Sequence, residues 1–208
     1  KEPEPAKEPE PAKEPAPALP ATVPQPEPEP EPDIPPDAWN TTWASLPTRM
    51  PVEPRALLRL LGMVATKDRP KVVSALKEQP LEDIGLLVLS RRPGQEPSLG
   101  RGCALAAAQL ERGAWLNAIS RWDSDEAAGV RAAVAEAIGA LGKPASITAL
   151  NRLSDDDDPG VRVAAARAFA QLGARLNKEM LAKAALTRLS EDKDEDVKTT
   201  AKELLDNL

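Results

Sequence analysis

The fold is decided by a stretch that the sequence contains twice. It reads DEAAGVRAAVAEAIGALG over residues 125–142 and DDDPGVRVAAARAFAQLG over residues 156–173, at an offset of 31 residues. Val, Arg, Leu and Gly recur at matching positions, and the residues between them place apolar side chains at helical spacing. A fixed period of this size indicates stacked helical repeats, in which each repeat buries its apolar face against the next.

Weaker copies of this stretch lie on both sides of the pair. An earlier copy covers residues 81–113, with Gly100 at the position that Arg131 and Arg162 occupy later. A third clear copy fills residues 177–208, at an offset of 36 rather than 31 residues. Its last helix is polar on one side, which suits the end of a stack.

Two more helices are predicted before the repeats, because proline stands at the first turn of each. They cover residues 54–66 and the residues that follow Pro70. The next helix, over residues 81–90, is almost entirely apolar, so we expect it to be buried on several sides. Residues 38–208 are therefore predicted to be all-α, a right-handed α-α superhelix of four to five helical hairpins.

The first 37 residues have a different composition. A KEPEPA hexad is followed by two more copies, the last slightly altered, and residues 24–32 alternate Pro with Glu or Gln. Such a segment has too little apolar surface to fold, so a disordered Pro/Glu/Lys-rich spacer is predicted over residues 1–37. At about 3.1 Å per residue it would reach on the order of 120 Å when extended. A ligand for a proline-binding module is the alternative interpretation.

The charge of the chain is concentrated in this segment. Residues 1–38 carry three Lys against eight Glu and two Asp, whereas the whole chain has a net charge of −6. The rest is nearly neutral and lacks the basic excess of a non-specific nucleic-acid binder, so no nucleic-acid partner is expected. No apolar run is long enough to cross a bilayer, so we expect no membrane insertion either.

The residue types argue against catalysis. The chain has no His and a single Cys, Cys103, which lies among small residues and is expected to be buried. His-based triads and His-ligated metal centres are thereby excluded. An acidic run from Asp192 has calcium-loop spacing, but Val197 stands where the loop needs Gly. We expect no enzyme activity, no cofactor, and no catalytic or metal-binding residue.

Two of the four Trp residues lie close together just before the first predicted helix. Asp37 can cap a short helix in which Trp39, Trp43 and Leu46 share one face. The two rings either seal the exposed end of the stack or anchor a partner, since Trp is enriched among interface hot spots. Both interpretations stay open on the sequence alone.

The pattern Asp-x-x-Val-Arg-x-Ala-Ala at residues 158–165, followed by a small-residue helix that ends in Leu-Gly, resembles the HEAT repeat. It is most similar to the short HEAT-like repeats of the phycocyanobilin lyase group. The resemblance covers about residues 81–208 and implies the fold more than the function, because such repeats serve in unrelated scaffolds.

The resemblance also implies structural roles for a set of charged residues. In the family, an Asp in the turn pairs with the Arg after Val in a neighbouring repeat, which would make a ladder; Lys198 would be a weaker last rung because an ammonium lacks the planar fork of Arg. Asp158 and Asp196 are predicted to cap the helices that follow them. The expected ladder and cap residues are Asp125, Arg131, Asp156, Asp158, Arg162, Asp192, Asp196 and Lys198.

We therefore predict a non-catalytic protein–protein interaction scaffold, tethered by its tail within a larger assembly. In HEAT-like solenoids the second helix of each hairpin lines the concave face, where a partner would dock. The candidate partner-binding residues are Trp39, Trp43, Glu136, Arg167, Gln171 and Glu203. The competing prediction is an accessory subunit of an enzyme such as a bilin lyase.

The tail gives a hint about location. Its Glu/Pro and Lys/Pro composition resembles the tethers that hold folded domains of bacterial envelope proteins away from a membrane anchor. We therefore favour an extracytoplasmic, tethered location, in the periplasm, over a cytoplasmic one. Nothing in the sequence names the protein partner.

Overall fold

The computed structural model describes residues 53–208, and all of the regular structure in this part of the chain is helical. The longer helices are α1 (Pro54–Met63), α2 (Arg69–Lys77), α3 (Leu81–Ser90), α4 (Pro97–Gln109), α5 (Leu116–Ile119), α6 (Ala128–Leu141), α7 (Ile147–Leu153), α8 (Pro159–Leu176), α9 (Glu179–Leu189) and α10 (Glu195–Asp206). Short 3-10 helices flank them at η2 (Thr66–Asp68), η3 (Gly113–Trp115), η4 (Ser120–Trp122) and η5 (Pro144–Ser146). The predicted spacer and the Trp39/Trp43 segment lie outside the described residues.

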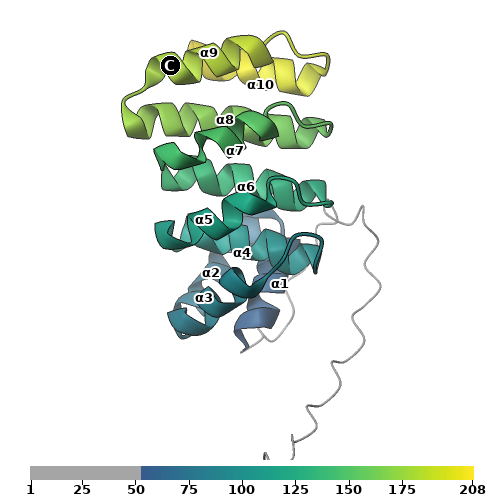
Figure 1. The fold of residues 1–208 in the computed structure, drawn as a ribbon, viewed down its shortest axis with the longest axis vertical. Helices are drawn as coiled ribbons and strands as arrows, with labels where there is room; N and C mark the ends of the chain where they lie inside the picture. Colours follow the sequence, from purple (N-terminus) through teal and green to yellow (C-terminus); the bar gives the residue numbers. More distant parts are fainter. Residues whose placement is uncertain (1–52) are drawn as a thin grey trace, which may run out of the picture. The chain divides into compact units, whose positions relative to one another are not determined.

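The helices from α3 onward form a stack of hairpins in two layers (Figure 1). The first helices of the hairpins, α3, α5, α7 and α9, make one layer, and the second helices, α4, α6, α8 and α10, make the other. Each second helix packs on the next, α4 on α6, α6 on α8 and α8 on α10. The prediction of an all-helical solenoid with four to five hairpins is confirmed for residues 53–208.

The core repeats with the same offsets as the sequence. Each second helix buries a valine or leucine at the same position of the repeat, and each first helix likewise buries an aliphatic side chain. In the second helices these residues are Leu99, Val130, Val161 and Val197. In the first helices they are Val88, Ile119, Leu150 and Leu186. Because equivalent residues bury equivalent surface, each hairpin is stabilised by its neighbours rather than by a core of its own.

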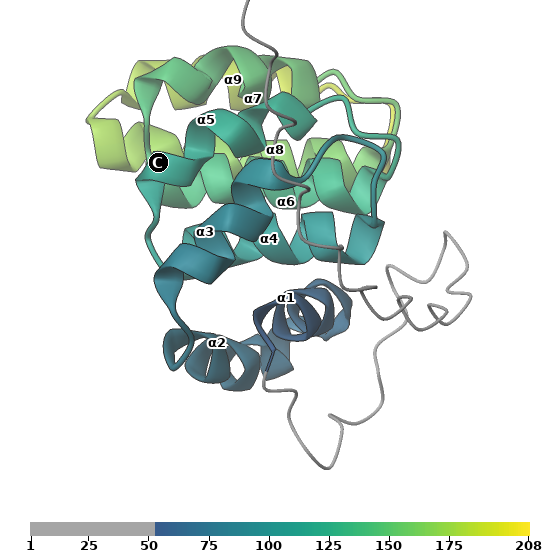
Figure 2. The same ribbon diagram turned by 60° about the horizontal axis from the view of Figure 1, so that its bottom comes forward.

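Helix α1 joins the stack at one end by packing on α4, and α2 lies beside it (Figure 2). The crossing of α1 and α4 requires glycine on both helices. A Cβ atom on Gly62 would overlap the carbonyl oxygen of Ser98, and one on Gly102 would overlap that of Leu58. The two backbones are therefore in direct contact, and α4 is buried along almost its whole length.

Some expectations about single elements were wrong. Helix α1 ends at Met63 rather than at residue 66. Helix α3 has the predicted bounds but is not buried on several sides, since Leu86 and Leu89 are 66% and 59% exposed. Only the side that carries Ile84 and Val88 faces the core. A run of apolar residues does not by itself say how many neighbours a helix has.

The five extra residues of the last repeat lengthen α8. This helix continues to Leu176, whereas α6 ends at Leu141. Asn177 then ends α8 in the left-handed conformation, with φ of 51°, and the Lys178 amide donates to the carbonyl of Gly173 at 2.8 Å. Asn tolerates this conformation better than most residues, so the insertion is absorbed as about one more helical turn.

Candidate interaction surface

Arginine–aspartate contacts tie each hairpin to the next. Arg131 donates from Nε and Nη2 to the carboxylate of Asp156, both at 2.7 Å. Arg162 donates in the same way to Asp192, at 2.9 and 2.8 Å. In both cases Nη1 donates to a carbonyl in the loop of the arginine's own repeat, that of Asp125 or Asp156, at 2.7 Å. Each guanidinium therefore bridges two consecutive loops with planar, paired hydrogen bonds.

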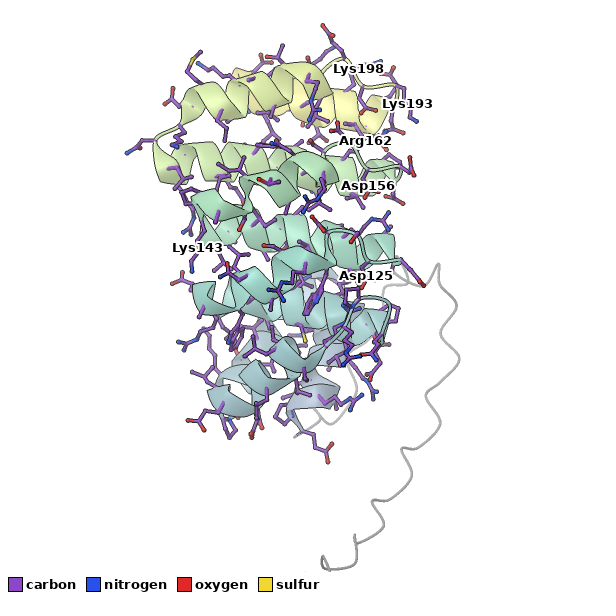
Figure 3. The ribbon with its side chains drawn as sticks, in the orientation of Figure 1. Asp125, Lys143, Asp156, Arg162, Lys193 and Lys198 are labelled. Carbon is purple, nitrogen blue, oxygen red and sulfur yellow. The ribbon has the colours of Figure 1, made fainter. Side chains whose placement is uncertain are left out.

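The same aspartates also shape the loops that they belong to. Asp125 accepts from the Ala127 amide at 3.1 Å, Asp156 from Asp158 at 2.9 Å, and Asp192 from Asp194 at 2.9 Å. The labelled side chains Asp125, Asp156, Arg162 and Lys198 lie along one edge of the stack, whereas Lys143 lies on the other (Figure 3). We call the loops on the first of these sides the ladder edge. The Asp and Arg residues that the sequence assigned to the ladder come together there.

A second set of contacts crosses the same boundaries in the opposite direction. Arg152 on α7 donates to Asp123 in the preceding loop at 2.6 Å, and Arg188 on α9 donates to Asp155 at 2.6 Å. The arginine side chains are 62% and 51% exposed, so solvent weakens these pairs. The forward pairs of Arg131 and Arg162 are far less exposed, so they contribute more to the stability of the contact between repeats.

The electrostatics of the ladder favour the charged forms. Hydrogen bonds from Arg162 hold the pKa of Asp192 below its ordinary value, although burial opposes this shift. Hydrogen bonds to Asp156 and Asp192 raise the pKa values of Arg131 and Arg162, again against burial. The pKa shifts at Arg162 and Asp192 both favour the charged pair that joins the last two hairpins.

The first rung is built differently, because Gly100 stands where the later repeats have arginine. Arg91, from the end of α3, takes the place of the missing side chain and donates from Nη2 to Asp125 at 2.9 Å. Its guanidinium lies over the ring of Trp122, 4.7 Å from the centroid. A Cβ atom on Gly100 would overlap this guanidinium, so Arg91 can take this position only because residue 100 is glycine.

The last rung and its cap differ from the prediction. Lys198 pairs with Glu195 of its own helix, and within the described residues it makes no pair across a repeat boundary. Asp158 caps α8 as predicted, accepting from the Val161 amide at 3.1 Å. The cap of α10, however, is Asp194 and not Asp196, since the Asp194 carboxylate accepts from the Asp196 and Val197 amides. Asp194 stands 36 residues after Asp158, so the repeat offset itself predicts Asp194 as the cap.

The exposed side of the second helices carries the candidate docking residues. Arg167 and Gln171 on α8 and Glu203 on α10 are exposed at positions that recur with the repeat. We call them, with Glu136, the second-helix face. Glu136 is partly covered, because Arg69 at the start of α2 donates to its carboxylate at 2.9 Å. The free part of the face therefore belongs to α8 and α10.

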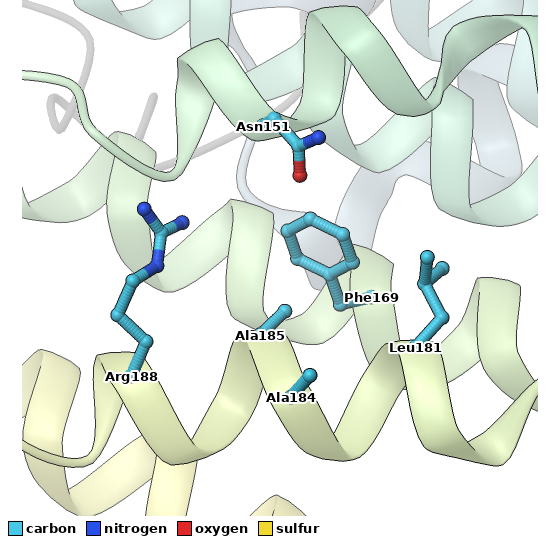
Figure 4. A pocket seen from close by; sticks show the side chains of 6 residues that line it. All are labelled: Asn151, Phe169, Leu181, Ala184, Ala185 and Arg188. Carbon is cyan, nitrogen blue, oxygen red and sulfur yellow. The ribbon is translucent and has the colours of Figure 1, made fainter.

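A pocket of about 480 Å³ opens between α7, α8 and α9 (Figure 4). Phe169, which is 1% exposed, lies between Asn151 on one side and the side chains of α9 on the other. The lining residues are Asn151, Phe169, Leu181, Ala184, Ala185 and Arg188. Most of this lining is apolar, and its one charged member already pairs with Asp155. The pocket suits an apolar side chain better than a reacting substrate.

Within residues 53–208 no cluster of three or more His, Cys, Asp or Glu side chains is arranged to hold a metal ion. Cys103 is fully buried, and burial raises the pKa of its thiol to about 12. A thiol in that state is a poor nucleophile. None of the helices described is both long and apolar enough to cross a membrane.

The comparisons with known proteins agree with this geometry. Residues 114–206, which run from the start of the second hairpin to the end of α10, match the family model described as HEAT repeats. This match supports a HEAT-repeat protein. Comparison of the chain with curated proteins and with solved structures gives no match.

Sequence reasoning missed Arg91 and Arg69 as structural residues. Adding 31 to Arg91 gives Trp122, and the next equivalent residues are Leu153 and Leu189, all buried. An arginine at a position that is otherwise apolar, nine residues before Gly100, could have indicated that Arg91 replaces the missing ladder arginine. The contact of Arg69 with Glu136 belongs to no repeat and left no such signal.

Proposed function

We propose that this chain is a non-catalytic protein–protein interaction scaffold, held within a larger assembly of the cell envelope by its N-terminal tail. HEAT repeats generally serve as protein-interaction scaffolds, and residues 114–206 match them. The observation that carries the proposal is the ladder. It fixes consecutive hairpins to one another, so the side chains on the second-helix face are presented at a constant spacing.

The second-helix face is the proposed docking surface. Arg167, Gln171 and Glu203 are exposed there, and they offer two charges of opposite sign with an amide between them. Such a surface fits a partner with the complementary order of charges rather than an apolar one. The spacer, residues 1–37, would let the scaffold search for this partner around an anchoring point, outside the cytoplasm.

Charge reversal on the second-helix face tests the proposal. The full chain would be used to capture partners from its own cells, beside an Arg167→Glu/Glu203→Lys variant and a Thr148→Glu control on the exposed side of α7. We expect the double variant to lose at least nine tenths of the captured partner while its melting temperature stays within about 2 °C, since surface changes cost little. The proposal would be contradicted if the double variant still captured the partner, or if the Thr148→Glu variant lost the partner while the double variant kept it.

The accessory-subunit alternative has a direct test as well. The full chain would be incubated with a bilin and passed through a desalting column, and the visible absorbance of the protein fraction would be measured. We expect no colour, because the pocket over Phe169 has a single aromatic lining residue. A stable coloured complex that is lost on Phe169→Ala would replace the scaffold proposal with the accessory-subunit one.

A further inference from the structure

Helix α3 carries an apolar patch that the solenoid itself does not use. Leu86 and Leu89 lie one turn apart on the side opposite the buried Ile84 and Val88, and Leu81 at the margin is 37% exposed. We call Leu86 and Leu89 the α3 patch. The later first helices are polar or small at the equivalent positions. These positions hold Asn117, Thr148 and Ala184 in place of Leu86, and Ser120, Asn151 and Thr187 in place of Leu89.

This difference shows that exposed leucines are not a property of the repeat. The other first helices keep their fold with hydroxyl, amide or small side chains at these positions, so the stack does not require leucine there. Two adjacent exposed leucines on one helix face leave apolar surface in water, and the apolar side of one amphipathic helix would cover it.

The chain has such a helix in its sequence, shortly before the described residues begin. Trp39, Trp43 and Leu46 fall at positions i, i+4 and i+7, so a helix here would gather all three on one face. Asp37 stands at the cap position, and Pro47 marks the end, because the residue before a proline disfavours the helical conformation. The side opposite the rings holds only small and polar residues.

The described structure begins close to the loop that follows α3. Arg55 and Arg59, in the first two turns of α1, both pair with Glu96, which lies six residues after the end of α3. Helix α1 contacts α3 directly. Residues 47–52 can span about 20 Å when extended, which is about twice the diameter of a helix. The segment before them can therefore reach the outer side of α3.

We propose that residues 37–46 form an amphipathic helix that docks on the α3 patch through Trp39 and Trp43. The two rings are then part of an intramolecular contact and are not available to a partner. The second-helix face is then left as the surface for partners. This contact holds whether or not that face binds a protein.

Disulfide trapping in the full chain tests the contact. Trp43→Cys would be combined with Leu86→Cys and, as a control, with Thr148→Cys, the equivalent exposed position on α7. Cys103 does not compete, because it is buried and its thiol pKa is raised to about 12. A disulfide needs Cα atoms within about 7 Å. We expect the Trp43/Leu86 pair to close within one molecule at least ten times faster than the control pair.

A second variant keeps both rings in place. Leu86→Asn/Leu89→Asn gives α3 the kind of side chain that the later helices have, with Thr148→Asn as its control. We expect the double variant to shift the tryptophan emission to the red and to lower the melting temperature, and the control to do neither. Equal closure rates for the two cysteine pairs, disulfides that form only between molecules, or unchanged emission and melting in the double variant would each overturn the proposal.

Discussion

The side chain of Arg91 is 1% exposed, and it pairs with an Asp125 side chain that is fully buried. Its Nε and Nη1 atoms have no hydrogen-bond partner within residues 53–208. Removing one member of a buried pair leaves the other charge without compensation, which typically costs about 3–5 kcal/mol. We therefore expect Arg91→Ala to lower the free energy of unfolding by about that amount, measured by urea denaturation.

The repeat supplies its own control for this prediction. In Arg91→Leu/Gly100→Arg, the first hairpin receives the arrangement of the third, with Leu at the core position and Arg on the second helix. The new arginine stands 25 residues before Asp125, which is the separation between Arg131 and Asp156. We expect the double variant to be more stable than either single variant. Additive losses would mean that Arg91 is not a substitute for the ladder arginine.

Glu111 shows what a single backbone conformation costs. It has φ of 54°, and the Arg112 amide donates past it to the carbonyl of Ala107 at 2.9 Å, which ends α4 in the same way that Asn177 ends α8. The equivalent residue one repeat later is Gly142, with φ of 63°. A left-handed conformation costs a non-glycine residue about 1–2 kcal/mol, part of which glycine loses again through entropy in the unfolded chain.

We accordingly expect Glu111→Gly to raise the stability by about 0.5–1 kcal/mol, seen as a melting temperature higher by about 1–4 °C. Glu111→Ala is the matched control, since it removes the same side chain but keeps the strain. If both substitutions have the same effect, the side chain of Glu111 matters and its backbone conformation does not.

The pKa of Asp192 makes the last complete rung sensitive to acid. Because its pKa is lower in the folded than in the unfolded chain, the unfolded state binds more protons in the window between the two values. The contribution of this pair is present above about pH 4 and disappears as the pH falls through the folded pKa. We expect Asp192→Asn to melt well below the parent at pH 7, and the difference to shrink as the pH falls further below about 4. A constant difference across this range would contradict the assignment.

At the scale of elements, the capping residues can be separated by mutation. Asp194 accepts two amides at the start of α10, whereas Asp196 only lies in its first turn. Loss of a cap typically costs about 1 kcal/mol. We expect Asp194→Ala to lower the unfolding free energy by about that amount and Asp196→Ala to lower it by less than half as much, compared by chemical denaturation. The reverse order would restore Asp196 as the cap.

The helices themselves were largely predictable from the sequence, because proline, capping aspartate and aliphatic spacing act locally. The bounds of α3 were predicted to the residue, and α8 begins directly after its predicted cap, Asp158. Helix α10 begins at Glu195, two residues before the predicted Val197. The exposure of Leu86 and Leu89 was not predictable, since it depends on which elements surround α3. Local pattern fixes what an element is and leaves open what covers it.

For the whole molecule, the sequence predicts the contacts that repeat and misses those that occur once. The pairs of Arg131 and Arg162 occupy equivalent positions in successive repeats and were expected from the resemblance to HEAT repeats. The Arg91 rung, the Arg69–Glu136 contact and the Gly62–Gly102 crossing each occur once, at the α1 end of the stack. A contact that occurs once has no equivalent in another repeat, so comparing the repeats cannot reveal it.

The two ends of the described stack differ in how they are held. Ala166, Leu186, Leu189, Val197 and Ala201 form a small buried cluster separate from the main core. In stacked repeats a terminal unit with its own small cluster opens at a lower free energy than the centre. By hydrogen exchange, we expect the amides of α9 and α10 to exchange before those of α6. Uniform protection from α4 to α10 would contradict this order.

A variant in the ladder sharpens that measurement. Arg162→Ala cuts the hydrogen bonds that join the loop before α8 to Asp192. We expect it to speed exchange in α9 and α10 and to leave α4 unchanged, because each hairpin contacts only its neighbours. Arg167→Ala, one turn further along the same helix and exposed, is the control and should change neither.

The position of the ladder has a mechanical consequence. Among residues 53–208 the arginine–aspartate pairs lie at the loops on one edge. On the other edge, the connections at Gly113 and Lys143 are joined by a single hydrogen bond, from the Lys143 ammonium to the Gly113 carbonyl at 2.6 Å. Because the ion pairs join the loops on one edge, the hairpins resist separation at that edge and separate more easily at the opposite edge. Thermal bending of these hairpins therefore has a preferred direction, and a ligand that wedges between the free ends would meet less resistance than one that pulls the loops apart.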